Sequence, residues 1–151
     1  MIFNLIKNKN SEKIQSEKGN LIKMIALLIH AAKIDENYSE KEKKLIISFA
    51  EMSSNKKLNK EQINSLVDQA EQYEKNSNQI LEFTQNVKKM DLNTKRRVLE
   101  FLWKIILSDN KSDVYESNLM RRICGLLYLP DKLSGEIKLD IIKQKKNDVH
   151  S

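Results

Sequence analysis

The sequence predicts an all-α protein, a single-domain bundle of about seven helices built from a duplicated unit of helix, acidic turn and helix. Three glycines and one proline in 151 residues leave little of the turn chemistry that β-hairpins need. Lys, Glu and Leu are abundant and favour helices. A chain of this length forms one domain and buries roughly two thirds of the surface that its unfolded form exposes.

The duplication is visible as an acidic segment that occurs twice, as Asp35-Glu-Asn-Tyr-Ser-Glu-Lys-Glu42 and as Asp109-Asn-Lys-Ser-Asp-Val-Tyr-Glu116. Placing Asp109 over Asp35 also aligns the apolar residues on both sides. Before the turns, the aligned residues are Met24, Ile25, Leu27, Leu28, Ile29, Ala31 and Ala32 with Val98, Leu99, Phe101, Leu102, Trp103, Ile105 and Ile106. After the turns, they are Leu45, Ile46, Phe49 and Ala50 with Leu119, Met120, Ile123 and Cys124. This shared register predicts an internal repeat.

Residues 1–20 are expected to form an N-terminal extension that Gly19-Asn20 separates from the domain over residues 21–142. Its short apolar start either docks on the domain or lies on a membrane surface. Docking is favoured, because one apolar turn binds lipid weakly without a second anchor. A first helix is expected over about 20–34, and its apolar residues surround most of its circumference, as is typical of a central helix. His30 on this helix is expected to be a packed, hydrogen-bonded core histidine.

Capping patterns predict where the following helices start. Ser39 with Glu42 forms a capping box, which starts a second helix at about residue 40. Asn59 with Gln62 starts a third helix in the same way, and Asn78 starts a fourth. These two helices connect the repeated units.

The second unit repeats the pattern of the first. Asn93-Thr94 precedes the long apolar run that matches the first helix, and Asp113 with Glu116 caps the match to the second. After Pro130, apolar spacing predicts a final helix despite Gly135. Residues 143–151 are expected to form a charged tail.

The charge of the chain argues against several classes of partner. The net charge of +6 comes from 27 basic and 21 acidic residues, mixed along every helix. Arg96-Arg97, Arg121-Arg122 and the tail segment Lys143-Gln-Lys-Lys146 are able to attract phosphate, but no aromatic residues interleave with them to stack bases. No nucleic acid is therefore expected, and the absence of a long apolar run limits membrane contact to the periphery. The single Cys124 is expected to be a small core residue in a cytoplasmic protein.

The first turn begins like an EF-hand loop, but the rest of the loop does not fit. An EF-hand has Gly at position six and a bidentate Glu at position twelve, where this chain has Glu40 and Ile46. In the second turn, position three is Lys111. Neither turn is therefore an EF-hand.

Over roughly residues 21–129, the arrangement resembles the tellurite-resistance TerB family and the TerB-like domains. Asp35 and Asp109 match the family's loop aspartates, and Glu42 and Glu116 match its helix-starting glutamates. The closing Gly-Leu-Leu-Tyr-Leu-Pro130 is similar to the end of the family's second copy. The resemblance implies a stress-response module associated with tellurite that binds a divalent metal through its paired acidic turns.

Two interpretations of the turns remain open. If the two turns converge, Asp35, Glu42, Asp109 and Glu116 repel one another unless a cation or a basic residue lies among them. Carboxylate ligands favour calcium, magnesium or manganese over zinc. Alternatively, both glutamates serve only as helix caps, and the protein is a helical adaptor that binds a protein partner. No nucleophile with a base and no phosphate-binding loop is present in the sequence, so no enzymatic activity is expected.

Overall fold

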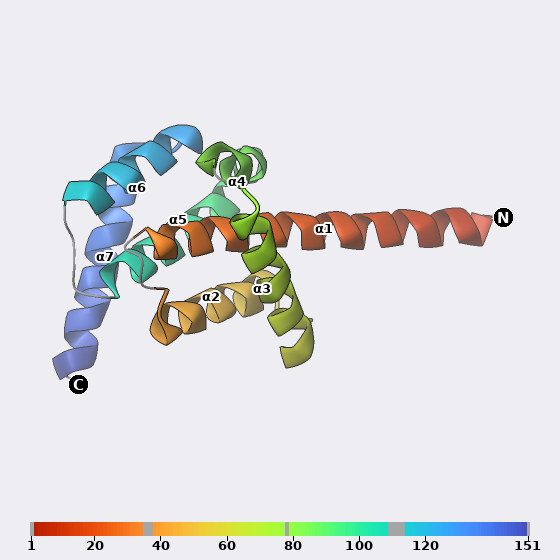
Figure 1. The fold of residues 1–151 in the computed structure, drawn as a ribbon, viewed down its shortest axis with the longest axis horizontal. Helices are drawn as coiled ribbons and strands as arrows, with labels where there is room; N and C mark the ends of the chain where they lie inside the picture. The colour runs from red at the N-terminus through yellow and green to blue at the C-terminus, as the bar shows by residue number, and fades with distance from the viewer. Residues whose placement is uncertain (1, 35–37, 78, 109–113, 151) are drawn as a thin grey trace.

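The structure is a computed structural model that describes residues 2–34, 38–77, 79–108 and 114–150 (Figure 1). These residues form seven α-helices and no strand, which confirms the predicted all-α class and the number of helices for this part of the chain. The helices are α1 (Ile2–Lys33), α2 (Glu40–Ser53), α3 (Lys60–Lys75), α4 (Ile80–Val87), α5 (Leu92–Leu107), α6 (Val114–Leu126) and α7 (Asp131–His150). Within the described ranges, no helix combines the length and the apolar character needed to cross a bilayer.

The second half of α1 is the central element of the bundle. It packs against α2, α3, α4 and α5. Its apolar residues from Leu21 to Ala32 are buried except Ile22, which is partly buried, as the sequence predicts for a central helix. His30 lies half-buried among them and is hydrogen-bonded, in agreement with the expectation for this residue.

The first half of α1 differs from what the sequence predicts. The helix does not begin near residue 20 but runs without interruption from Ile2, and its first half extends away from the bundle (Figure 1). The docking expected for the N-terminal extension is therefore wrong. Gly19 lies inside the helix, because one glycine weakens a helix by only about 1 kcal/mol and removes no backbone hydrogen bond.

The helix starts follow the capping rules with one correction. The predicted boxes of α2 and α3 are both formed, by Ser39 with Glu42 and by Asn59 with Gln62. Helix α5 begins at Leu92, earlier than predicted, because the Asp91 carboxylate accepts a hydrogen bond from the Thr94 amide at 2.7 Å. The caps predicted at Asn78 and Asp113 lie outside the described residues.

The two repeated units share their pattern of burial but not their neighbours. Every aligned apolar residue of the two first helices, α1 and α5, is buried. In the second helices, Leu45 and Leu119 are partly buried, and the three aligned residues that follow each of them are buried. Helix α2 packs against α1, α3 and α5, whereas α6 packs against α4 and α7. Common ancestry of the two units stays a prediction.

Helix α7 closes the bundle and is longer than predicted. It packs against α5 and α6 and continues through the expected charged tail to His150. Its Ser134 hydroxyl accepts a hydrogen bond from Trp103 Nε1 on α5 at 2.9 Å, deep in the core. This contact places the first turn of α7 beside the second half of α5.

Candidate functional site: the acidic turns and an adjoining basic cleft

Glu42 is the one predicted site carboxylate whose side chain the structure describes. It is 1% exposed in the first turn of α2. Its Oε1 atom accepts hydrogen bonds from the Ser39 amide and the Ser39 hydroxyl, both at 3.0 Å, and the Glu42 amide donates to Ser39 Oγ at 3.2 Å. The structure therefore gives Glu42 the capping role that the sequence predicted.

The other three predicted ligands lie outside what the structure describes. Asp35 and Asp109 lie outside the described residues, as does the side chain of Glu116, although its backbone belongs to α6. Among the residues whose side chains are described, no group of three or more His, Cys, Asp or Glu side chains is arranged to hold a metal ion.

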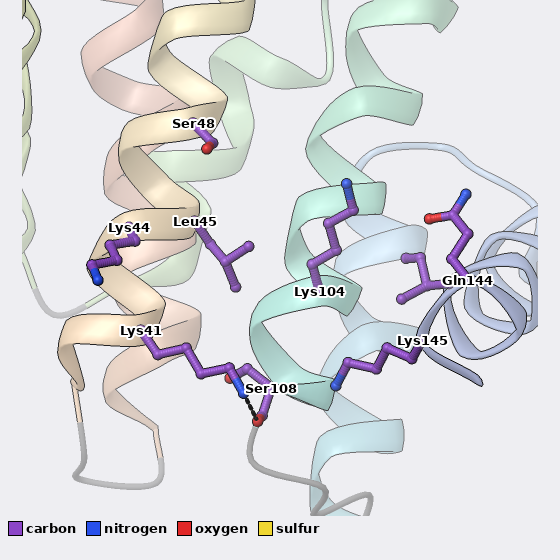
Figure 2. Close-up of a pocket in the computed structure, with 9 residues that line it drawn as sticks. Lys41, Lys44, Leu45, Ser48, Lys104, Ser108, Gln144 and Lys145 are labelled. Atoms are coloured by element: carbon purple, nitrogen blue, oxygen red, sulfur yellow. Dashed lines mark hydrogen bonds between the residues drawn. The ribbon is translucent and has the colours of Figure 1, made fainter. Parts of the chain in front are cut away.

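The described residues next to the two turns contact each other. Lys41, which directly precedes Glu42 in the chain, donates from Nζ to the carbonyl oxygen of Ser108 at 3.1 Å (Figure 2). Ser108 directly precedes Asp109. The start of α2 thus lies beside the end of α5, within the reach of one lysine side chain.

Two lysines converge on this end of α5. Lys145 Nζ from α7 donates to the carbonyl oxygen of Leu107, next to the Ser108 carbonyl that Lys41 contacts. Figure 2 shows the two side chains reaching the helix end from opposite sides. The free carbonyls at a helix C-terminus carry roughly half a negative charge, so they stabilise the two ammonium groups there.

Tyr38 connects the first turn to α3. Its hydroxyl donates to Glu71 Oε1 at 3.2 Å, and Lys43 Nζ lies 3.5 Å from the same oxygen. Burial is the largest of the effects that raise the pKa of Tyr38 far above its ordinary value, followed by the nearby negative charges of Glu71, Glu42 and Glu40. The phenol therefore stays protonated, and the carboxylates around it create a negative potential beside the turn.

A second buried carboxylate links α3 to α1. Glu74 is 7% exposed and accepts a hydrogen bond from Lys33 Nζ at 2.7 Å, and its other oxygen lies 3.3 Å from His30 Nδ1. The His30 ring also contacts the Phe83 ring, with centroids 5.3 Å apart. His30 is thus held by structural contacts.

Cys124 is a core residue, as expected. Its side chain is buried on α6, and burial raises the pKa of its thiol. A thiol in this environment is a poor nucleophile, because the thiolate is the reactive form.

A basic cleft of about 420 Å³ lies between α2, α5 and α7, and the sequence alone did not predict it (Figure 2). The described residues that line it include four lysines, and apolar side chains contribute part of its wall. The lysines are Lys41, Lys44, Lys104 and Lys145. The tail segment that includes Gln144 and Lys145 is the one part of the cleft with a signal in the sequence, because its lysines are able to attract phosphate. Its partners on α2 and α5 are distant in sequence and looked like ordinary surface lysines.

Comparisons with known proteins identify the family of the chain. Residues 21–139 match the family described as tellurite resistance protein TerB. No curated protein and no solved structure gives a match. The matched region begins at Leu21, where the buried part of α1 also begins, and extends into α7. It covers most of the chain and both acidic turns, so the protein belongs to the TerB tellurite resistance family.

Proposed function

We propose that the protein is a non-catalytic stress-response module, acting in a tellurite-resistance-like role, that binds a divalent cation between its two acidic turns. The ligands are Asp35, Glu42, Asp109 and Glu116. Hard oxygen ligands of this kind select calcium, magnesium or manganese. The hydrogen bond between Lys41 and Ser108 carries the proposal, because it joins the residues that directly precede one ligand in each turn.

The chemistry of Glu42 is compatible with this role. A carboxylate has two oxygens and about four acceptor sites, so helix capping and cation ligation do not exclude each other. The negative charges that raise the pKa of Tyr38 also attract a cation to this end of α2. The ion would screen the repulsion among the four carboxylates.

The alternative function is that of a helical adaptor whose acidic turns are purely structural. The completed capping box favours it, because this box already explains Glu42. The ammonium of Lys41 also favours it, since a basic residue beside the turns is able to take the place of a metal ion. The two functions differ in whether the bound partner depends on a cation.

Isothermal titration of the purified protein with calcium, magnesium and manganese tests the proposal. We expect one of these ions to bind, and we expect Asp35→Ala and Asp109→Ala each to abolish the heat because the site is shared. Asp68→Ala, on the exposed face of α3, is the matched control and should bind like the wild type. Absence of heat with all three ions would end the cation proposal.

Lys41→Gln separates the two interpretations further. If a metal and the Lys41 ammonium compete for the same carboxylates, this variant should bind the ion more tightly than the wild type. If the turns are only structural, the variant should bind no ion. A pull-down from cell extract with and without chelator then tests the adaptor function, which requires a protein partner that chelator does not release.

A further inference from the structure

We propose that the outer segment of α1, residues 2–13, binds the surface of an anionic lipid bilayer. Its apolar residues enter the interface between water and the acyl chains, and its lysines contact the phosphate groups of the lipids. The segment lies outside residues 21–139, which match the TerB family, and its role does not rest on the proposed cation site.

The backbone of α1 holds the outer segment away from the bundle. The helix runs without interruption from Ile2 to Lys33, and its first half extends beyond the other described helices (Figure 1). Glu12 and residues 15–18, which lie between the outer segment and the buried part of α1, are exposed. A broad surface such as a bilayer is therefore able to reach the end of α1 without meeting the described helices of the bundle.

The sequence of the outer segment combines an apolar and an electrostatic attraction. Four of the five residues from position 2 to position 6 are apolar, namely Ile2, Phe3, Leu5 and Ile6. Between residues 2 and 11, the only charged residues are Lys7 and Lys9. One short apolar group binds lipid weakly by itself, and basic residues beside it act as the second anchor when the lipid is anionic. The lysines therefore supply the second anchor that the apolar turn needs.

The spacing along the helix fits the depth of a bilayer interface. At about 1.5 Å per residue, the backbone from residue 2 to residue 6 rises roughly 6 Å. Helices that bind membrane surfaces bury their apolar part about 5–10 Å below the head groups. A helix that enters with this end first thus brings Lys7 and Lys9 to the level of the phosphate groups.

The same pattern favours a lipid surface over a second copy of the chain. Residues three or four apart share one face of a helix, so the face that includes Ile6 continues as Lys9 and Lys13. Two helices that pair along their length need an apolar stripe that repeats over several turns, and these lysines interrupt it. An anionic bilayer instead offers apolar depth to the end of the helix and negative charge to the lysines.

Cosedimentation of the full chain with phospholipid vesicles tests the proposal, in buffer with a chelator so that no cation bridges protein and lipid. We expect binding to vesicles that contain phosphatidylglycerol to be about tenfold or more tighter than binding to phosphatidylcholine alone. The affinity should fall as salt concentration rises, because salt screens exposed charges. Asp35→Ala should bind the vesicles like the wild type, so failure of the cation site and failure of this site are distinguishable.

Two double variants locate the binding in the outer segment. Lys7→Gln/Lys9→Gln should weaken binding to the anionic vesicles roughly 25-fold, because each lysine near such a surface contributes about fivefold. Phe3→Ser/Ile6→Ser should weaken it by about tenfold or more, because it removes half of the apolar residues that enter the interface. Circular dichroism checks the fold of each variant.

Lys56→Gln/Lys57→Gln is the matched control. It removes the same charge from two exposed lysines in the loop after α2 and should bind the vesicles like the wild type. A loss as large as that of the lysine variant in α1 would show that the charge of the whole protein, and not the outer segment, attracts the lipid.

Fluorescence quenching tests contact with the acyl chains directly. Trp103, the single tryptophan of the chain, is 5% exposed in the bundle. Anionic vesicles with brominated acyl chains should leave the wild-type fluorescence unchanged and should quench the additional fluorescence of Phe3→Trp.

Three further results would overturn the proposal. The first is binding to phosphatidylcholine alone that is as tight as binding to the anionic vesicles. The second is a Phe3→Trp protein that brominated lipid does not quench. The third is the absence of vesicle binding, which is the result expected if the outer segment binds a protein partner instead.

Discussion

Glu42 is a residue whose charge and shape have separable roles. Its carboxylate closes the capping box, and a glutamine at the same position closes the same box without a charge. Only the charge would serve a bound cation. The local pattern of Ser39 with Glu42 was sufficient to predict the cap, because both partners lie within one turn of helix.

Two substitutions separate these roles. Ser39→Ala should lower the free energy of unfolding by about 1 kcal/mol, because it removes the cap oxygen, and should leave cation ligation by Glu42 in place. Glu42→Gln should keep most of the stability but weaken cation binding. Chemical denaturation and calorimetric titration measure the two effects. A Glu42→Gln protein that binds the ion like the wild type would remove Glu42 from the ligand set.

The Asp91 carboxyl should make the stability of the fold depend on pH. The backbone hydrogen bond from Thr94 lowers the pKa of this carboxyl below its ordinary value of 3.8. The carboxylate therefore stabilises the fold above that value, and the contribution is lost as pH falls through the lowered pKa. Asp91→Ala should melt below the wild type at pH 7, and the difference should shrink as the pH falls below 3.8. Asp68→Ala is the control, and an Asp91→Ala difference that persists in acid would contradict the assignment.

At the scale of elements, the packing of α3 on α1 depends on the buried Glu74. Its two oxygens meet groups of His30 and Lys33, both on α1. The sequence places Glu74 on a helix among other charged residues and gives no sign that it is buried. Its burial follows from the position of α3 against the central helix, which local patterns do not specify.

Glu74→Ala should therefore destabilise the protein by about 1–3 kcal/mol, because it leaves partly buried donors on α1 without their acceptor. Glu61→Ala, an exposed glutamate in the first turn of the same helix, should change the stability much less. Urea denaturation of both variants measures the difference. Equal effects would show that the contacts of Glu74 add little to the packing of α3.

Features of the helices that depend on neighbouring residues were predictable from the sequence, and features that depend on the packing of distant segments were not. The capping boxes and the buried faces of α1 and α5 were predictable, since they depend on neighbours within a few residues. The length of α1 was not, because Gly19-Asn20 is a weak break that the helix on both sides overrides. The basic cleft was missed because it combines residues from α2, α5 and α7, and only their placement in the bundle brings these lysines together.

For the whole molecule, the buried core that the structure describes lies outside the first half of α1. The core begins at Leu21, and Glu12 and residues 15–18 are exposed. The family match begins at the same place. The TerB unit therefore contains its own core.

Removal of residues 1–17 should accordingly leave the bundle folded, with a change in unfolding free energy of about 0.5 kcal/mol or less. Thermal denaturation followed by circular dichroism measures this change. Removal of residues 1–28 is the contrasting variant and should prevent folding, because it takes away Leu21 and the buried residues that follow. A large loss of stability in the shorter deletion would mean that the projecting half supports the core.

The unbroken backbone of α1 also has a mechanical consequence. A helix rises about 1.5 Å per residue, so residues 2–18 form a rod roughly 25 Å long that is continuous with the innermost helix of the bundle. Such a rod fixes both the distance and the direction of whatever its tip touches, which a coiled tether would not do. A force or torque applied at the tip would be transmitted directly to the centre of the molecule, because no flexible linker lies between the two.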